Sequence, residues 1–290
     1  MFAFVTAYIV ILYQQKKQPI EGFTSDDVVT LLLWGIIGLL VGARLIATTV
    51  YDPTHYYLSH PWMIFWPFRN GSFVGLQGMS YHGGAIGAAV GGFLYAKKYK
   101  RDFFEIADLV ILGIPLGYTF GRLGNFFNAE LWGRVTTASW GMVFPYAEKF
   151  STRLEWVREI ADEIGLPYES GMLVNLPRHP SQLYEALFEG VLLWLVLWFI
   201  FRKRKTFHGQ LLSLYLIGYG TVRFFIEYLR EPDSDLGFIL ALGKEQDPDA
   251  LFLSFLNFSM GQLLCLIMII IGIVMIPLLK RRNMIKGKKR

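Results

Sequence analysis

The sequence has little cysteine and little charge. Cys265 is the one cysteine among 290 residues, so the chain cannot form an internal disulfide. It lies inside a long apolar run, where a thiol is a poor nucleophile because burial disfavours the thiolate. Charged residues make up 18% of the chain, whereas soluble domains carry roughly 25%. These shortages disfavour a disulfide-stabilised secreted domain, a catalytic cysteine and an ordinary soluble fold.

Three further features are missing from the sequence. The apolar start, residues 1–13, has no basic region before it and no small-residue cleavage site after it. We therefore interpret it as part of a membrane span and not as a signal peptide. Internal repeats and low-complexity segments are not evident. The acidic residues show no metal-ligand spacing, so we expect neither a metal nor another cofactor.

Long apolar runs are abundant instead. Hydrophobic residues make up 53% of the chain and aromatic residues 16%. Runs close to the roughly 20 residues that cross a bilayer as a helix lie at 30–50, 81–96, 103–120, 183–201, 211–229 and 256–279. The run at 1–13 reaches only about 20 Å against a hydrocarbon core of roughly 30 Å, so it is interpreted as an incomplete first span. The sequence predicts an all-α polytopic membrane protein in which residues 1–290 form one integral membrane domain with seven transmembrane helices.

The basic residues alternate along the chain with these runs. They cluster at 16–17, 97–101, 202–205 and 280–290, whereas the intervening segments carry mixed or acidic charge. Because Lys and Arg in short loops stay on the cytoplasmic side, the N-terminus is predicted outside and the basic tail at 280–290 inside. The net charge of +5 then follows from topology and attraction to anionic lipid, so no nucleic-acid partner is expected.

The largest interruption of the apolar pattern spans residues 122–180. It mixes charges, contains the amphipathic stretch EWVREIADEIG at 155–165 and runs into LPRHPSQLYE. The predicted topology places it outside, between spans four and five. Because it is too short to count as an independent domain, we predict a small extracytoplasmic cap.

Polar and ionisable side chains gather near one end of the predicted spans. Such groups are costly within a membrane and face a bundle interior or a cavity. The set comprises Arg44, His82, Arg122, Asn125, Asn128, Glu130, Gln182, Glu185, Glu189, Arg223, Glu227 and Arg230, all predicted near the extracytoplasmic leaflet. Helical spacing puts the three members from the fifth span on one face, and the three from the sixth span on another. Asp108, in the inner half of its span, is the exception and receives no role.

This distribution favours a headgroup site over a transport pathway. A transporter more typically shows polar groups near the bilayer midplane, with broken helices and repeated halves. Two or three arginines near one leaflet suit bidentate binding of a phosphate, so a phospholipid is the expected ligand. Gly84, Gly87 and Gly91 form a small-residue face on the third span, where another helix can pack closely.

Each polar residue also has a structural alternative. His82 is equally consistent with an aromatic side chain at the headgroup level, and Arg223 and Glu227 have the spacing of a helix-stabilising ion pair. The glutamates of the fifth span are consistent with hydrogen bonds to neighbouring helices. Asn125 and Asn128 are consistent with helix-end and turn residues. Because these polar residues converge on one leaflet, a binding or catalytic site is favoured over separate structural roles. Their positions do not identify the reaction.

Five motifs, in this order and at these intervals, carry a resemblance to a known family. They are HGGAIG at 82–87, GRLGNFFNAELWG at 121–133, LPRHPSQLYE at 176–185, GYGTVRFFIEYLREPD at 218–233 and SMGQLL at 259–264. The chain resembles the bacterial phosphatidylglycerol:prolipoprotein diacylglyceryl transferase family over nearly its whole length. The resemblance implies transfer of diacylglycerol from phosphatidylglycerol to the lipobox cysteine thiol of a prolipoprotein, which forms a thioether and releases glycerol 1-phosphate. It also implies a bacterial inner-membrane protein with seven spans, whose site faces the periplasmic leaflet.

The same resemblance implies a set of site residues. The catalytic set is His82, Arg122 and Arg223, and the substrate-binding set is Arg122, Asn125, Asn128, Glu130, Gly133 and Glu227. A thiol with an ordinary pKa of about 8.5 is mostly protonated near neutrality, so His82 is the candidate base that would raise the thiolate fraction. The two arginines would stabilise the charge that develops on the leaving phosphate. Asn125 would orient the headgroup, while Glu130 and Glu227 would fix the arginines.

One part of the family pattern is absent. Tyr8 and Tyr13 do not match the tyrosine-bearing stretch of the family's first span, so no tyrosine is assigned to the site. Because the first span is also short, we expect that Met1 is not the native start and that upstream codons add at least one apolar turn. The alternative function is that of a lipid-binding or lipid-flipping protein, which holds the headgroup without chemistry. Membrane lipid is a partner in both cases, whereas prolipoprotein signal peptides are partners only of the transferase.

Overall fold

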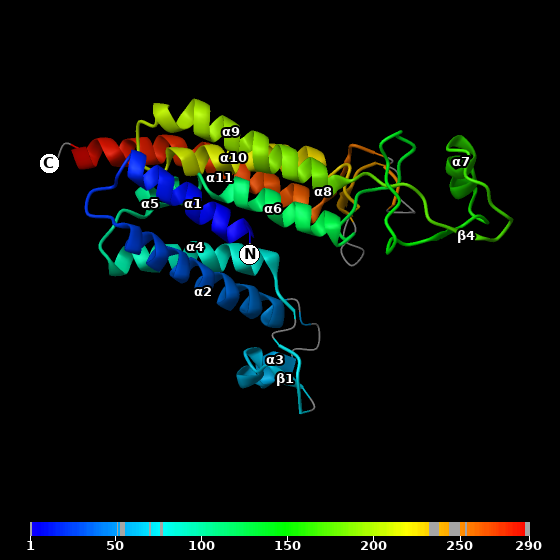
Figure 1. Ribbon diagram of the computed structural model, residues 1–290, viewed down its shortest axis with the longest axis horizontal. Coiled ribbons are helices and arrows are strands. Elements are labelled where there is room, and N and C mark those ends of the chain that lie inside the picture. Colours follow the sequence, from blue (N-terminus) through cyan, green and yellow to red (C-terminus); the bar gives the residue numbers. More distant parts are fainter. Residues whose placement is uncertain are drawn as a thin grey trace. The chain divides into compact units, whose positions relative to one another are not determined.

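The computed structural model describes residues 2–50, 52, 56–69, 71–75, 78–231, 238–243, 250–252 and 254–287, apart from the side chains of residues 69, 81, 82, 286 and 287. Most of the described residues are helical (Figure 1). The chain divides into two compact units: Tyr8–Val110 forms one, and Met1–Ala7 with Ile111–Arg290 forms the other. Each unit has its own cluster of buried apolar residues.

The unit Tyr8–Val110 is built mainly from helices. Its elements are α1 (Phe2–Lys17, which begins in the other unit), α2 (Ser25–Thr49), α3 (Tyr56–Ser59), η1 (Pro61–Ile64), β1 (Phe68–Arg69), β2 (Ser72–Phe73), α4 (Tyr81–Lys98) and α5 (Phe103–Val110). β1 and β2 pair in antiparallel fashion. Helix α2 begins at a capping box, in which the Thr24 hydroxyl accepts from the Asp27 amide at 3.3 Å and the Asp27 carboxylate accepts from the Thr24 amide at 2.7 Å. Two amide groups at this helix start are thereby satisfied.

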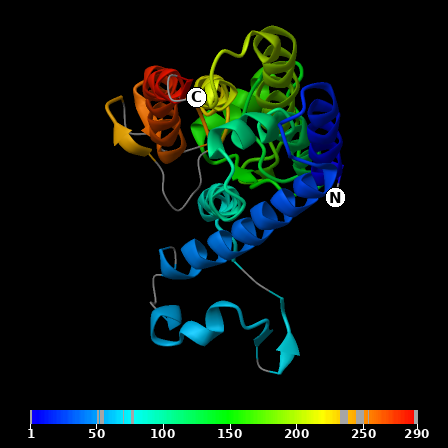
Figure 2. The same ribbon diagram turned by 90° about the vertical axis from the view of Figure 1, so that its left-hand side faces the viewer.

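Glycines let α2 and α4 cross at close range (Figure 2). A Cβ atom added to Gly38 would collide with the Gly87 carbonyl, and one added to Gly42 would lie 2.7 Å from the Gly87 Cα. Gly91 meets the α2 backbone in the same way, so the predicted small-residue face is confirmed at Gly87 and Gly91. Gly84 differs, because a Cβ there would make an ordinary 3.5 Å contact with side chains.

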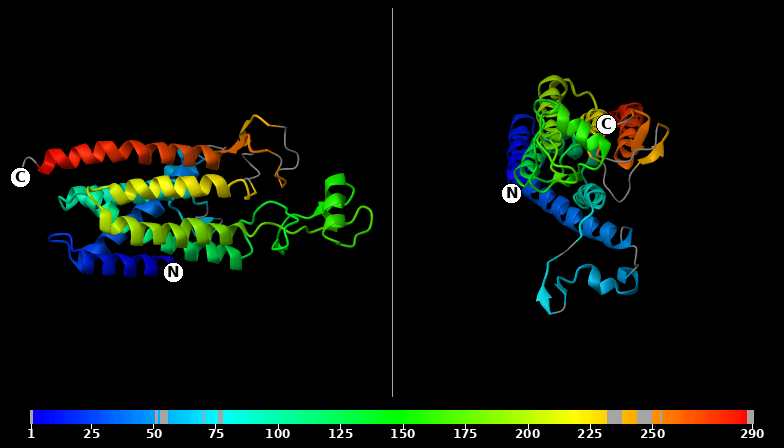
Figure 3. Two further views of the ribbon diagram at one scale, coloured as in Figure 1. Left: turned by 90° about the horizontal axis from the view of Figure 1, so that it is seen from above. Right: turned by 90° about the vertical axis from the view of Figure 1, so that its right-hand side faces the viewer.

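The second unit holds the remaining elements. They are α6 (Ile114–Phe127), β3 (Phe150–Ser151), α7 (Glu155–Glu163), β4 (Leu173–Val174), α8 (Ser181–Tyr184), η2 (Glu185–Leu192), α9 (Leu193–Leu195), η3 (Val196–Phe201), η4 (Arg202–Arg204), α10 (Gln210–Ile226), β5 (Phe238–Ala241), β6 (Asn257–Ser259) and α11 (Met260–Gly287). The elements from α8 to η4 follow one another without a break, and η2 and η3 are π-helical. This long helical segment lies beside α6 and α10, and α10 packs in turn against α11 (Figures 1 and 3). The strands form two antiparallel pairs, β3 with β4 and β5 with β6.

Residues 128–180 connect α6 to α8 and extend beyond the ends of these helices (Figure 3). This segment supplies most of a small core, in which Val135, Phe150, Val157, Val174 and Leu176 are buried together with Ala250. Helix α6 continues to Phe127, so the connecting segment begins at residue 128 and not at 122, where the sequence pattern sets the cap boundary. Its location outside the membrane stays a prediction.

Three helical segments among the described residues are long and apolar enough to cross a membrane, namely Ser25–Thr49, Ser181–Arg204 and Met260–Ile285. A fourth is added if α5 and α6 count as one broken span. The predicted span at 103–120 is broken because α5 ends at Val110 and Pro115, which lacks an amide hydrogen, lies in the first turn of α6. Helix α10 is apolar but shorter, at 17 residues. Helices thus occur at every predicted span position, while the total of seven spans and their orientation stay predictions.

The exposed faces of the long helices are apolar, as expected for contact with lipid. On α11, Ile267, Ile270 and Ile273 are each at least half exposed. On α2, Leu33 and Ile37 are likewise more than half exposed. A helix satisfies its own backbone hydrogen bonds and can present such side chains to hydrocarbon. The fold is therefore that of a mostly α-helical membrane protein.

Candidate functional site

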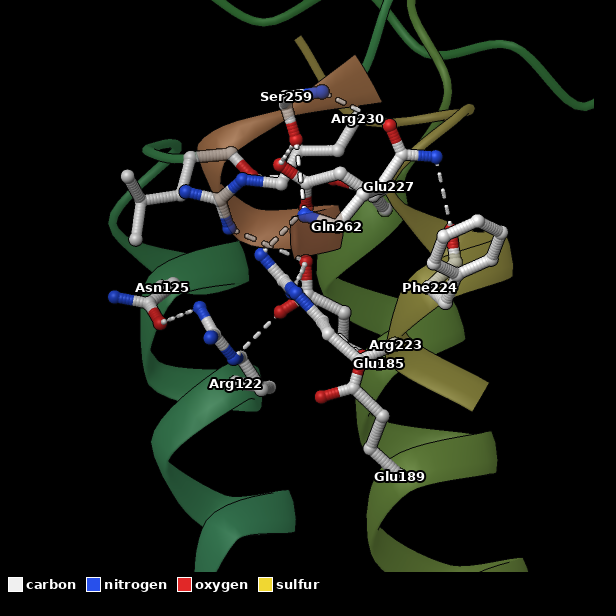
Figure 4. Close-up of polar contacts among 12 residues, drawn as sticks. Arg122, Asn125, Glu185, Glu189, Arg223, Phe224, Glu227, Arg230, Ser259 and Gln262 are labelled. Carbon is white, nitrogen blue, oxygen red and sulfur yellow. Dashed lines mark hydrogen bonds and ion pairs between the residues drawn. The ribbon is translucent and has the colours of Figure 1, made fainter. Parts of the chain in front are cut away.

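A buried carboxylate, Glu185, lies at the centre of a polar cluster in the unit that contains residues 111–290 (Figure 4). Its Oε2 atom is 2.6 Å from Nε of Arg122, and its Oε1 atom is 3.0 Å from Nη1 of Arg223. Nη1 of Arg230 lies 3.3 Å from the same Oε1. We call the six residues Arg122, Glu185, Glu189, Arg223, Glu227 and Arg230 the Arg–Glu cluster. Because the Glu185 side chain is 0% exposed, the loss of one partner would leave a buried charge uncompensated.

Three helical elements bring the cluster together. Arg122 lies near the end of α6, Glu185 begins η2, and Arg223 lies in the last turn of α10. The predicted polar face of the fifth span is confirmed, because Gln182, Glu185 and Glu189 are all fully buried. Glu185 and Glu189 both fall in the π-helical segment, a geometry that is rare in proteins and frequent at functional sites.

Tyr118 connects the two glutamates of η2 to Arg122. Its hydroxyl oxygen lies 2.6 Å from Oε2 of Glu189 and 3.2 Å from Oε2 of Glu185. The same oxygen accepts a hydrogen bond of 2.6 Å from Nε of Arg122, one helical turn further along α6. Glu189 also lies 3.6 Å from Nη1 of Arg223. Tyr118 therefore holds Arg122 and both carboxylates in one hydrogen-bonded network.

Glu227 fixes Arg223 from a second side. Its Oε2 atom lies 2.9 Å from Nη2 of Arg223, and its Oε1 atom accepts a hydrogen bond of 3.0 Å from the Ser259 hydroxyl. A Cβ added to Gly261 would lie 2.8 Å from Oε1 of Glu227, so a larger residue there would push this carboxylate out of its position. The predicted contact of Glu227 with an arginine is confirmed. Part of the SMGQLL motif thus serves to seat Glu227.

The asparagines of the GRLGNFFNAELWG motif meet Glu130. Oε1 of Glu130 accepts from Nδ2 of Asn125 at 2.8 Å and from Nδ2 of Asn128 at 3.4 Å. Oδ1 of Asn125 in turn lies 3.5 Å from Nη1 of Arg122. The sequence predicts that Glu130 fixes an arginine directly, but in the described part of the chain it reaches Arg122 only through Asn125. The reason is that the chain turns after α6, so Glu130 points back at the asparagines of its own motif.

The backbone around Glu130 is strained. Ala129 and Leu131 have φ angles of 51° and 58°, in the left-handed region that non-glycine residues rarely adopt. Nε2 of Gln182 donates a hydrogen bond of 2.7 Å to the Glu130 carbonyl, and the Ser181 hydroxyl donates one of 3.2 Å to the Leu131 carbonyl. These contacts from α8 hold the turn in place, and strain that is held in this way is found preferentially at functional sites.

Gly133 marks a point of close backbone approach. Its amide donates to the His179 carbonyl at 2.9 Å, and it forms a β-bridge with Arg230. An added Cβ would collide with the Leu229 carbonyl and lie 2.8 Å from Cβ of His179. Gly133 therefore places the motif against the end of α10 by its lack of a side chain, and does so next to an arginine of the cluster.

His179 is a half-buried histidine beside this bridge. Its Nδ1 lies 3.2 Å from the Tyr184 hydroxyl, which accepts a 2.7 Å hydrogen bond from Nε1 of Trp140. The Tyr184 hydroxyl can therefore donate its own proton to Nδ1, which requires the unprotonated ring nitrogen. Burial lowers the pKa of His179 below its usual value, because the charged form is poorly solvated there.

A second ion pair closes the same region. Nη1 of the fully buried Arg178 lies 2.5 Å from Oε2 of Glu231, just after the cluster residue Arg230. The same Oε2 accepts a hydrogen bond of 2.8 Å from Nε1 of Trp132. The indole of Trp132 also lies under the Arg178 guanidinium, 5.7 Å from ring centroid to Cζ. This contact ties the end of the GRLGNFFNAELWG motif to the segment that follows α10.

The Arg–Glu cluster combines balanced charge with spare donors. It contains three arginines and three glutamates, and the side chains of Arg122 and Arg223 are each 13% exposed. A guanidinium has five N–H groups, and within the described residues the contacts of Arg122 use Nε and Nη1. Its Nη2 group can therefore serve an oxygen ligand. Arginines preorganised by carboxylates in this way are suited to a phosphate oxygen on which charge develops.

Two predicted polar residues belong to the unit Tyr8–Val110. His82 is the second residue of α4, and its side chain lies outside the described part of the structure. Arg44 is buried in α2 and donates to the carbonyls of Ile64 and Gly78. The structure therefore brings together the predicted residues Arg122, Asn125, Asn128, Glu130, Gly133, Arg223 and Glu227, all of them in the other unit, and leaves the role of His82 a prediction.

The predicted site omits several members of this network, namely Tyr118, Glu185, Glu189, Arg230 and Ser259. The sequence contains a signal for two of them, because Glu185 and Glu189 share a polar face with Gln182 in an apolar span. Tyr118 precedes Arg122 by four residues, which is the spacing of side-chain neighbours on a helix. A tyrosine in an apolar run is common, so that spacing alone does not distinguish Tyr118 from its neighbours.

The family described as prolipoprotein diacylglyceryl transferase matches residues 1–278 of this chain. The chain belongs to that family. The relatives include the phosphatidylglycerol–prolipoprotein diacylglyceryl transferase of Treponema denticola, 47% identical over all of this chain and 90% of that protein. Those of Treponema pallidum and Chlorobaculum tepidum are 47% and 42% identical, over 93% and 99% of this chain and 85% and 88% of the relatives.

Membership of the prolipoprotein diacylglyceryl transferase family confirms the resemblance that the five motifs carry. The match extends over both compact units, so it does not depend on the Arg–Glu cluster alone. Four of the motifs have a structural counterpart in the cluster: LPRHPSQLYE supplies Glu185, GRLGNFFNAELWG supplies Arg122, GYGTVRFFIEYLREPD supplies Arg223, and SMGQLL seats Glu227. The Arg–Glu cluster of this prolipoprotein diacylglyceryl transferase family member is thus organised around one buried carboxylate.

Proposed function

We propose that this protein transfers the diacylglyceryl group of phosphatidylglycerol to the lipobox cysteine thiol of a prolipoprotein. The observation that carries the proposal is a pair of ion pairs made by the fully buried Glu185. Its carboxylate oxygens lie 2.6 Å from Nε of Arg122 and 3.0 Å from Nη1 of Arg223. It fixes two guanidinium groups near one end of the helices of this unit, where a phosphate can meet them. The names of relatives that are up to 47% identical supply the substrates.

The reaction joins sulfur to carbon and releases a phosphate monoester. The thiolate sulfur attacks the glyceryl carbon that carries the phosphate ester, and a C–S bond forms as the C–O bond breaks. The bonding electron pair leaves with the phosphate oxygen, so the products are a thioether and glycerol 1-phosphate. Negative charge therefore increases on the phosphate as the bond breaks, and preorganised donors stabilise that change most.

The residues of the Arg–Glu cluster have different roles in this reaction. Arg122 and Arg223 bind the phosphate and stabilise the leaving group, and Glu185 and Glu227 hold their guanidinium groups in place. Glu185 thus acts through the arginines and is a positioning residue. The remaining predicted residues, Asn125, Asn128, Glu130 and Gly133, shape the headgroup site next to Arg122. A bidentate guanidinium suits this task better than a point charge.

His82 is proposed as the base that takes the thiol proton. The attacking thiol has an ordinary pKa of about 8.5, so a base is needed to raise the thiolate fraction near neutral pH. A neutral imidazole is the side chain best matched to that task. The HGGAIG motif, which places His82 at the start of α4, supports the proposal.

We propose that the protein is a seven-span bacterial inner-membrane protein with its site on the extracytoplasmic side. The alternation of basic clusters supports this orientation. In intact cells, cysteines at positions 100 and 204 of a Cys265→Ala variant should resist an impermeant thiol reagent, while a cysteine at Glu159 should react. Labelling of position 100 from outside would contradict the orientation.

Transfer of label tests the function against a lipid-binding or lipid-flipping protein. The purified chain is reconstituted with phosphatidylglycerol labelled in its acyl chains and mixed with a lipobox peptide. We expect the label on the peptide cysteine, and none on a peptide in which serine replaces that cysteine. A protein that moves lipid across the bilayer but leaves the cysteine peptide unlabelled would be a flippase.

A further inference from the structure

A basic pocket lies at the end of α10 and α11 that is remote from the Arg–Glu cluster. It has a volume of about 460 Å³, and its lining includes Lys205, Thr206, His208, Lys280, Asn283 and Met284. Arg223 lies in the last turn of α10, whereas the pocket adjoins its first residue, Gln210. Because Arg223 lies 13 residues after Gln210 on α10, the two sites are separated by roughly 20 Å along the helix axis. Two candidate membrane spans, Ser181–Arg204 and Met260–Ile285, end beside the pocket.

Hydrogen bonds between its two sides hold the pocket in shape. Oδ1 of Asn283 accepts from the His208 amide at 3.3 Å, and Nδ2 of Asn283 donates to the His208 carbonyl at 3.4 Å. Within the turn that precedes α10, the Thr206 amide and hydroxyl donate to Oε1 of Gln210 at 2.7 and 3.0 Å. Asn283 thus fastens α11 to the turn that precedes α10. The lysines of the two segments, Lys205 and Lys280, consequently line one cavity.

The two chain segments that line the pocket carry charge of one sign. Residues 202–209 and 280–287 contain eight Lys and Arg residues and no Asp or Glu; the eight are Arg202, Lys203, Arg204, Lys205, Lys280, Arg281, Arg282 and Lys286. The pocket also adjoins the N-terminal end of α10, whose cap residue Gly209 has a left-handed φ of 92° and no side chain to cap the first amides. Helix N-termini and lysines both favour an anion. These features favour an anionic ligand, and a phosphate group is one that fits them.

We propose that this pocket binds the phosphate of an anionic phospholipid in the leaflet opposite to the one that holds the Arg–Glu cluster. The flanking spans are apolar and expose side chains such as Leu278 to lipid, so a ligand seated between their basic ends has its acyl chains in hydrocarbon. Basic pockets between helix ends at a membrane surface bind lipid headgroups in this manner. The bound lipid is not consumed, because the pocket lies at the other end of the helices from the arginines. It anchors the ends of α10 and α11 to the membrane surface.

A fluorescent label inside the pocket tests this proposal on the full chain in detergent micelles. Met284 lines the pocket and is 57% exposed, so a Cys265→Ala, Met284→Cys variant can carry an environment-sensitive label there. Phosphatidic acid is the probe, because it carries a phosphate and is not the proposed donor lipid. We expect a saturable change in emission with phosphatidic acid and little change with phosphatidylcholine.

Matched variants distinguish lipid binding in the pocket from a general effect of net charge. Lys205→Gln with Lys280→Gln should raise the half-saturating concentration of phosphatidic acid by about tenfold or more, as the loss of charged hydrogen bonds implies. Lys16→Gln with Lys17→Gln removes the same charge from residues that do not line the pocket, and the half-saturating concentration should stay nearly unchanged. Lys205→Arg with Lys280→Arg keeps the charge and should retain binding. Equal responses to phosphatidic acid and phosphatidylcholine, or equal binding by the glutamine and arginine pairs, would overturn the proposal. The same emission change with inorganic phosphate at equal concentration would assign the pocket to free phosphate and overturn the lipid assignment.

Discussion

Nε of Arg122 lies 2.6 Å from Oε2 of Glu185, and this ion pair joins α6 to the π-helical start of η2. Arg223 and Arg230 reach the other oxygen of the same carboxylate from α10 and the residues after it. One buried side chain thus sets the distance between two arginines that are far apart in the sequence. The positions of the proposed phosphate-binding groups therefore depend on a glutamate that need not touch the phosphate.

The first prediction concerns this positioning role. Glu185→Gln keeps the size of the side chain but removes the charge that three arginines share, so we expect transfer to fall more than about tenfold and stability by about 3 kcal/mol. Glu189→Gln should cost less, because its arginine contact is longer, at 3.6 Å. Peptide transfer rates and thermal unfolding of both variants measure the difference. Equal losses in the two variants would contradict the central place of Glu185, and rescue of activity by Glu185→Asp would support it.

A glycine comparison within one motif tests the close approach at Gly133. Gly133→Ala puts a Cβ against the Leu229 carbonyl and 2.8 Å from Cβ of His179, so we expect it to destabilise the fold by about 1–3 kcal/mol. Gly121 and Gly124 lie on α6 with nothing within 4 Å of an added Cβ, and alanine there should raise stability by about 0.5 kcal/mol. Chemical or thermal unfolding in micelles ranks the three variants. A Gly133→Ala protein as stable as the other two would refute the close packing.

The lowered pKa of His179 predicts a pH dependence of stability. The unfolded chain takes up a proton on this histidine near its ordinary pKa of about 6.5, whereas burial keeps the folded form neutral to lower pH. The unfolded state therefore binds more protons as pH falls through 6.5, and stability drops. Between about pH 7.5 and 5.5, the unfolding temperature of wild type should fall more steeply than that of His179→Gln. Parallel curves for the two proteins would show that His179 does not contribute.

A pH profile also tests the proposed base. If His82 takes the thiol proton, His82→Gln should fold normally yet transfer slowly, and its deficit should narrow as pH approaches the ordinary thiol pKa of about 8.5. At that pH the thiol ionises without help. Transfer rates of wild type and variant from about pH 6.5 to 8.5 measure the trend. A deficit that is the same at every pH would assign His82 a positioning role.

Much of this architecture could be predicted from the sequence, because the bilayer imposes long apolar runs. Helices occur at all the predicted span positions, and Arg122, Arg223 and Glu227 are indeed neighbours. The break before α6 is harder to predict, because the apolar run continues through residues 111–113. The new helix begins just after them, with Pro115 in its first turn. Periodicity shows which face of a helix is polar, and does not show the lengths of neighbouring helices or where they break.

The site contacts that the sequence does not predict are those between segments far apart along the chain. The spacing of Glu185 and Glu189 shows that they share a face, but their partners lie on α6 and α10, and helical spacing within one segment does not identify them. For Glu130, in contrast, the sequence predicts a direct contact that the described part of the structure does not show. Its position in the motif favours an arginine partner, whereas left-handed residues on either side turn it toward Asn125 and Asn128.

The most direct test of the account is the mass of a lipobox peptide after incubation with phosphatidylglycerol and the reconstituted protein. Wild type should add one diacylglyceryl group to the cysteine and release one glycerol 1-phosphate for each peptide modified. Arg122→Lys and Arg223→Lys should each lower the rate by about a hundredfold, because a point charge does not replace a bidentate guanidinium at the leaving phosphate. An unmodified peptide with wild type, or full rates in both lysine variants, would contradict the account.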